Sequence, residues 1–202
     1  MRSLALALSV LLSGCALLSK QTPIEFRFFS PERARGGMTA ANAQQPVARL
    51  RLGRLASSAN LRHQIVRRAS SVEVEPYETL RWTETPVDYV ERSLVRALFG
   101  DGRFQQVVSG PALTLDVGVI AFEDALRDRR RVGRVQLSYR LHDERAVLMS
   151  GVVDVERDAA ANTIDAVVVA IGAAMDGATA EIAERVARQL RAPGDGVARK
   201  QE

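Results

Sequence analysis

The segment Leu113-Thr114-Leu115-Asp116-Val117-Gly118-Val119-Ile120-Ala121 has the clearest pattern in this chain of 202 residues. Every second residue is apolar: Leu113, Leu115, Val117, Val119 and Ala121. Thr114, Asp116 and Gly118 fall on the opposite face. A period of two residues with one apolar face is typical of a half-buried antiparallel strand. We therefore predict such a strand over residues 112–125.

Strand patterns also lie on both sides of this segment. Downstream, residues 131–141 and 147–157 alternate, with turn residues at His142-Asp143-Glu144, and residues 104–109 alternate before the turn Gly110-Pro111. Upstream, we expect strands at 24–29 and 47–55 and a hairpin formed by 63–68 and 72–76. Residues 31–46 and 77–86 are expected to be irregular.

Two helices complete the expected fold. Pro86 can occupy the first turn of a helix capped by Thr85, and apolar residues then recur at helical spacing until Gly100. The second helix is expected over 163–190, where Gly172 and Gly177 mark a bend or close packing. Its apolar stripe can form core or dock onto a second copy. The sequence predicts an α+β fold with an antiparallel-rich sheet packed against two amphipathic helices.

The N-terminus has the order of a lipoprotein signal peptide. Arg2 precedes the apolar run 4–12, and Ser13 and Gly14 come directly before Cys15. The run is shorter than the roughly 20 residues that span a bilayer. We expect cleavage after residue 14 and a diacylglyceryl group and an N-acyl chain such as palmitate on Cys15. The alternative is an ordinary secretory signal with a chance cysteine.

These features divide the chain into four parts. Residues 1–14 are the expected signal peptide, 15–23 a lipidated tether, 24–191 one folded domain and 192–202 a disordered tail. Because Cys15 is the only cysteine, the mature chain can form no internal disulfide bond. The net charge is +4. Lys20 and Lys200 are the only lysines, and we find no nucleic-acid recognition motif. Arginine-rich codon usage explains this bias, although arginines can also face anionic lipid or an acidic partner.

Catalytic and metal-binding patterns are weak. His63 and His142 lie in different segments, and no cysteine remains after lipidation to complete a metal site. No Gly-x-Ser-x-Gly motif is present. Glu123 and Asp124 form a glycosidase pair only with a suitable opposing acid, which the spacing does not supply. We name no catalytic residue and expect no enzyme and no cofactor.

Two sets of residues are candidate binding surfaces. The first is an aromatic and apolar set that serves either as core or as a partner contact: Tyr77, Leu80, Arg81, Trp82 and Pro86. The second is a basic hairpin that either contacts lipid phosphate or an acidic partner, or is a solvated hairpin tip: Arg127, Arg129, Arg130, Arg131 and Arg134.

Several motifs together resemble the ABC-type transport auxiliary lipoproteins. They are the lipobox, the early strand Phe26-Arg27-Phe28-Phe29, Leu50-Arg51-Leu52-Gly53, His63-Gln64-Ile65-Val66-Arg67-Arg68 and Leu80-Arg81-Trp82-Thr83-Glu84-Thr85-Pro86. The resemblance covers nearly the whole mature chain. The chain departs from the family in carrying phenylalanine where tyrosine is usual in the first strand, and in its long loop at 31–46.

The resemblance implies a non-enzymatic envelope protein. It would assist an ABC transporter and an MCE-domain protein in moving lipid or hydrophobic solute between membranes. Ala16, where an aspartate would favour the inner membrane, implies an outer-membrane anchor with the domain in the periplasm. A homo-oligomer is compatible with this role. The alternatives are a lipid-binding chaperone with its own apolar cavity and an envelope hydrolase.

Overall fold

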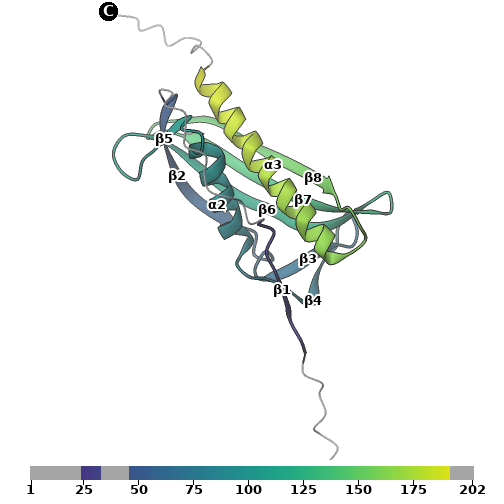
Figure 1. Ribbon diagram of the computed structural model, residues 1–202. Coiled ribbons are helices and arrows are strands. Elements are labelled where there is room, and N and C mark those ends of the chain that lie inside the picture. The colour runs from purple at the N-terminus through teal and green to yellow at the C-terminus, as the bar shows by residue number, and fades with distance from the viewer. Residues whose placement is uncertain (1–23, 33–45, 192–202) are drawn as a thin grey trace, which may run out of the picture.

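The computed structural model describes residues 24–32 and 46–191. In this part of the chain, one eight-stranded sheet carries two helices on one face (Figure 1). The elements in chain order are β1 (Arg27–Phe29), β2 (Ala48–Ser57), β3 (Gln64–Arg68), β4 (Val74–Trp82), α2 (Pro86–Phe99), β5 (Phe104–Gln106), β6 (Leu113–Arg127), β7 (Arg130–His142), β8 (Val147–Asp158) and α3 (Ile164–Arg191). The predicted mixed fold with two helices is confirmed. The expected signal peptide 1–14, the whole of the expected tether 15–23, residues 33–45 of the long loop and the expected tail 192–202 lie outside the described residues.

The central strand is β6. One of its edges pairs in parallel with β2 through its first half and with β3 through its second half, and its other edge pairs with β7. The pairs β3–β4, β6–β7 and β7–β8 are antiparallel, whereas β1–β4, β2–β5, β2–β6 and β3–β6 are parallel. Because four of these seven described pairings are parallel, the expectation of an antiparallel-rich sheet is not matched.

The physical reason is that alternation along a strand shows which face is buried but not the direction of its neighbour. Residues 58–112, which connect β2 to β6, contain two strands, a helix and a short strand. A connection of this length allows the chain to return to the same end of the sheet, as parallel pairing requires.

The segment 77–82 corrects a second expectation, because it is the end of strand β4 and not irregular. The pairing of β3 with β4 shifts between Gln64, opposite Arg81, and Val66, opposite Pro76. Such a bulge interrupts the regular alternation. Because the alternation is interrupted, the sequence of residues 77–82 does not show the period of two that predicts a strand.

The helix α2 begins as predicted. The Asp88 carboxylate accepts the backbone N–H of Thr85 at 3.0 Å, and Pro86 stands in the first turn, where a missing N–H costs nothing. Tyr89, Val90 and Leu94 are almost fully buried against the sheet. The predicted end at Gly100 is also confirmed.

The helix α3 crosses the sheet at close range. A Cβ built on Gly133 of β7 would lie 2.2 Å from the backbone nitrogen of Ile171, and one built on Gly172 would lie 2.1 Å from the carbonyl oxygen of Pro31. Gly172 therefore marks close packing. Although α3 is long and apolar enough to cross a membrane, 61% of its most apolar window is buried, as expected for a core helix.

Candidate functional site

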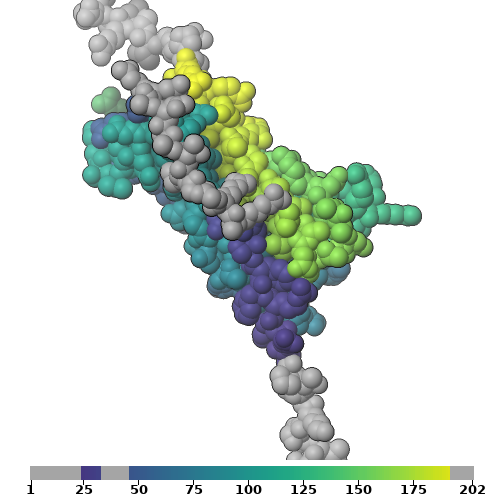
Figure 2. Space-filling model, in the orientation of Figure 1, coloured from purple at the N-terminus to yellow at the C-terminus, as the bar shows by residue number. Residues whose placement is uncertain are grey.

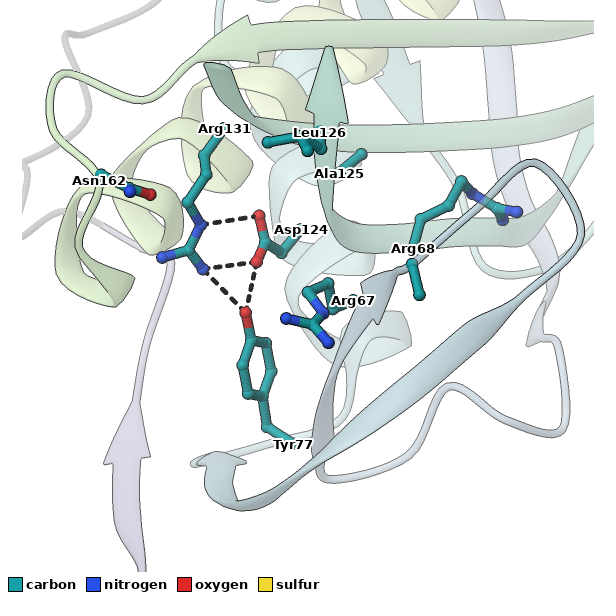
Figure 3. Close-up of a pocket in the computed structure, with 9 residues that line it drawn as sticks. Arg67, Arg68, Tyr77, Asp124, Ala125, Leu126, Arg131 and Asn162 are labelled. Atoms are coloured by element: carbon teal, nitrogen blue, oxygen red, sulfur yellow. Dashed lines mark hydrogen bonds and ion pairs between the residues drawn. The ribbon is translucent and has the colours of Figure 1, made fainter. Parts of the chain in front are cut away.

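The two predicted binding sets meet at one place. Tyr77 of β4 and Arg131 of β7 line a surface cavity of about 440 Å³, together with Arg67, Asp124 and Leu126 (Figure 3). The cavity lies on the helix side of the sheet because Asp124 follows Phe122 by two residues on β6, and Phe122 is a core side chain. The β3–β6 pairing brings Arg67 beside Asp124.

A buried carboxylate organises this cavity. Asp124 is 1% exposed and accepts the Tyr77 hydroxyl at 2.5 Å and the Arg131 guanidinium at 2.5 and 3.2 Å. Arg131 also donates to the Tyr77 oxygen at 2.9 Å. Burial, and then the hydrogen bond to Asp124, raise the pKa of Tyr77 to about 12. The phenol therefore stays protonated and holds Asp124 and Arg131 in place.

The other cations of the cavity are also paired. Arg67 lies over the Tyr77 ring at 5.8 Å and bonds Glu75 at 2.6 Å. Arg68 also lines the cavity, but its guanidinium turns toward the opposite face of the sheet and bonds Glu123 at 2.6 Å (Figure 3). Each of these guanidinium groups already has a carboxylate partner. The cavity is therefore a preorganised hydrogen-bonding surface and not a cleft of uncompensated positive charge.

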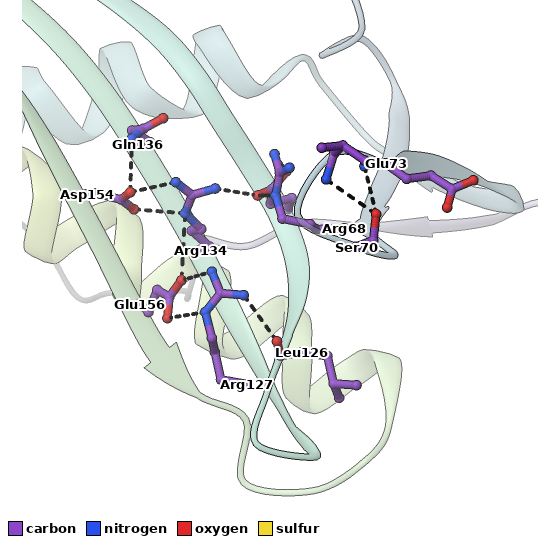
Figure 4. A network of polar contacts seen from close by, with 11 residues as sticks. Arg68, Ser70, Glu73, Leu126, Arg127, Arg134, Gln136, Asp154 and Glu156 are labelled. Atoms are coloured by element: carbon purple, nitrogen blue, oxygen red, sulfur yellow. Dashed lines mark hydrogen bonds and ion pairs between the residues drawn. The ribbon is translucent and has the colours of Figure 1, made fainter.

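A second polar network covers the opposite face of the sheet (Figure 4). The Glu123 side chain is 2% exposed and bridges Arg68 and Arg134, at 2.6 and 2.8 Å. Arg134 continues to Asp154 of β8 at 2.6 Å. Strands β3, β6, β7 and β8 are thereby linked by side chains as well as by backbone hydrogen bonds.

The basic hairpin is consequently neutralised over most of its length. Arg127 bonds Glu156 at 2.5 Å and Arg130 bonds Asp158 at 3.0 Å, and Arg131 and Arg134 have the partners given above. Arg129 occupies the β6–β7 turn with φ +66°. The hairpin's role in binding lipid or a partner stays a prediction.

Most of the aromatic and apolar set lies inside the fold. Trp82 is 1% exposed, and its ring packs edge-on against Phe122 at 5.3 Å. Leu80 and Pro86 are buried as well. Tyr77 and Arg81 are partly exposed, so they are the members of this set that a partner can reach.

One exposed set was not singled out from the sequence. Ile24, Phe26 and Phe28 are 69%, 45% and 64% exposed, while Phe29 packs against the core. The available signal was the alternation of residues 24–29, but it shows an apolar face without showing whether that face is covered. Within residues 24–32 and 46–191, no cluster of three or more potential ligands could hold a metal ion.

Comparison with known proteins identifies relatives of the chain. The family model described as "ABC-type transport auxiliary lipoprotein component" matches residues 33–183. A crystal structure of a Xanthomonas campestris protein is similar, with a TM-score of 0.68 and 19% identity over 81% of this chain and 96% of that one. A Chlamydia trachomatis hypothetical protein has a TM-score of 0.53 and 10% identity over 72% and 99%. No curated protein matches. At these identities the structures show a shared fold.

Proposed function

The chain belongs to the family of ABC-type transport auxiliary lipoprotein components, and we propose that it acts as a lipid-anchored docking component of an ABC transporter and MCE-protein system. This system would move lipid or a hydrophobic solute between the membranes of the envelope. The domain would stand in the periplasm and be held at the outer membrane by the lipid on Cys15. Its contribution is to position its partners and not to carry out a chemical reaction.

The packed interior is the observation that favours docking over a chaperone that encloses an acyl chain. Leu50 of β2, Phe122 of β6 and Ile171 of α3 belong to the core between the sheet and the helices, and each is 0% exposed. Trp82 and Tyr89 fill the same layer. A chaperone would need an apolar cavity of several hundred Å³ there. The cavity described above instead opens on arginine, tyrosine and aspartate side chains.

The buried acids also support a non-enzymatic role. A general acid or base needs a carboxyl group that can exchange a proton with a substrate. The oxygens of Glu123 are taken by Arg68 and Arg134, and those of Asp124 by Tyr77 and Arg131. These contacts give both side chains a structural role.

Membrane fractionation tests the lipid anchor. The full-length chain is expressed in its own host beside Cys15→Ser and Ala16→Asp variants, and the membranes are separated by density. We expect the natural chain in the outer membrane, Ala16→Asp in the inner membrane and no lipid label on Cys15→Ser.

Chemical crosslinking in intact cells then tests docking. We expect an MCE-domain protein or transporter subunit to be recovered with the natural chain and to be lost with Cys15→Ser. Lipid label on Cys15→Ser would contradict the anchor. Recovery of no envelope transport protein with a correctly localised chain would contradict the docking role.

A further inference from the structure

The residues that lead into β1 expose an apolar surface, which we call the β1 apolar edge: Ile24, Phe26 and Phe28. Side chains of an extended segment alternate, so these three share one face. The opposite face carries Phe29, which packs against the core, and Arg27, which pairs with Asp165 of α3 at 3.6 Å. The fold therefore fixes this segment by one face and leaves the apolar face open to its surroundings.

A cationic group, the guanidinium of Arg81, borders the β1 apolar edge. Phe28 pairs with Arg81 of β4, and the Arg81 guanidinium lies 4.7 Å from the centre of the Phe26 ring. Aromatic rings beside arginine are the combination favoured where hydrocarbon meets phospholipid headgroups, because the ring is apolar and the guanidinium binds phosphate. A groove on a partner protein would also accept the aromatic rings. The position of the β1 apolar edge in the molecule therefore decides between a membrane and a protein partner.

The position of the edge favours a membrane. β1 lies at one end of the molecule, far from β5, and the purple segment 24–32 runs from beside the helices to a projecting tip at that end (Figures 1 and 2). Ile24 is nine residues after Cys15 in the sequence. Nine residues span at most about 30 Å when fully extended. A lipid on Cys15 would therefore keep the edge within that distance of the bilayer surface.

We propose that Ile24, Phe26 and Phe28 enter the interfacial layer of the phospholipid bilayer that holds the lipid anchor. This inference rests on the anchor in the proposed function. The edge is then a second membrane contact, and Arg81 faces the lipid phosphates. Two contacts at one end of the domain fix its orientation, so that β5 and the C-terminal end of α3 face away from the membrane.

The single tryptophan of the chain makes a direct test possible. Trp82 is 1% exposed and serves as an internal reference. The full lipidated chain and a Phe28→Trp variant are reconstituted in vesicles of phosphatidylethanolamine and phosphatidylglycerol, with and without brominated acyl chains that quench nearby tryptophan. We expect brominated vesicles to remove most of the emission added by Phe28→Trp and to leave that of Trp82 unchanged.

A Val108→Trp variant is the matched control, because Val108 is 88% exposed and follows β5 at the other end of the molecule. Its added emission is expected to persist. Vesicle flotation measures the anchor separately. If the chain floats with the vesicles but the Phe28→Trp emission persists, the membrane contact is contradicted and the lipid anchor is not. Self-association or a protein partner would then cover the β1 apolar edge. A chain that fails to float overturns both. Equal quenching of Phe28→Trp and Val108→Trp overturns the proposed orientation.

Discussion

Substitution of Gly133 by alanine should loosen α3 from the sheet. The new Cβ would lie 2.2 Å from the nitrogen of Ile171, 2.5 Å from the carbonyl carbon of Ala170 and 2.7 Å from the Cα of Ile171. All three are backbone atoms, so no rotation of a side chain can relieve the overlap. The helix has to move by about 1 Å to restore ordinary contact, and a gap of that size forfeits a quarter to a half of each dispersion contact across it.

The expected cost follows from two opposing effects. Overpacking of a core costs about 1–3 kcal/mol, and here it falls at the upper end because a whole helix must shift. Replacing glycine by alanine also lowers the conformational entropy of the unfolded chain, which stabilises the folded state by about 0.4–1 kcal/mol. We therefore expect Gly133→Ala to lower the free energy of unfolding by about 2 kcal/mol.

Gly118→Ala is the matched control, since Gly118 lies on the neighbouring strand β6 but faces away from the helices. The group its Cβ would meet is the Ser138 hydroxyl at 2.6 Å, a side chain that can rotate. We expect a change within about 1 kcal/mol of the natural chain. Urea unfolding followed by the emission of Trp82 measures both variants. Equal stability of Gly133→Ala and Gly118→Ala would refute the close approach of α3 to β7.

Three further predictions concern the polar contacts. Ser93→Ala removes the 2.8 Å hydrogen bond that joins α2 to Thr179 of α3, and urea unfolding should show a loss of about 1 kcal/mol. Glu123→Gln should lower the free energy of unfolding by about 3 kcal/mol, because two arginines lose their buried carboxylate partner. The control Asp154→Asn, whose side chain is 37% exposed, should lower it by less than about 1 kcal/mol. Equal losses would contradict the burial of Glu123. The pKa of Tyr77 is raised from 10.0 to about 12, so its contribution to stability is full below pH 10.0 and is lost as the pH rises through 12. Absorbance of tyrosinate should show this late titration, and Tyr77→Phe should abolish it.

Local patterns were enough to predict most elements of the fold. The alternation of residues 113–121 became the central strand β6, and Thr85 and Pro86 marked the start of α2 within one residue. Both signals act between residues close in sequence. The direction of the pairing between β2 and β6 was not predictable, because it depends on a connection more than fifty residues long.

The candidate site was only partly visible for the same reason. Tyr77 and Arg131 were noted as members of separate sets, and their meeting at Asp124 depends on contacts across the sheet. Asp124 itself was considered only as half of a possible glycosidase pair with Glu123. Its burial follows from the pairing of β6 with β3 and β7, which no spacing along the sequence shows.

The central place of β6 also determines when this sheet can assemble as the chain is made. Without β6, the described sheet separates into β1-β4-β3, β2-β5 and β7-β8. If the chain becomes available from its N-terminus onward, it can form no continuous sheet until β6, which ends at Arg127, is complete. Long-range parallel pairing is slow to form. The strands β1 to β5 therefore stay in separate pieces until β6 is available to join them.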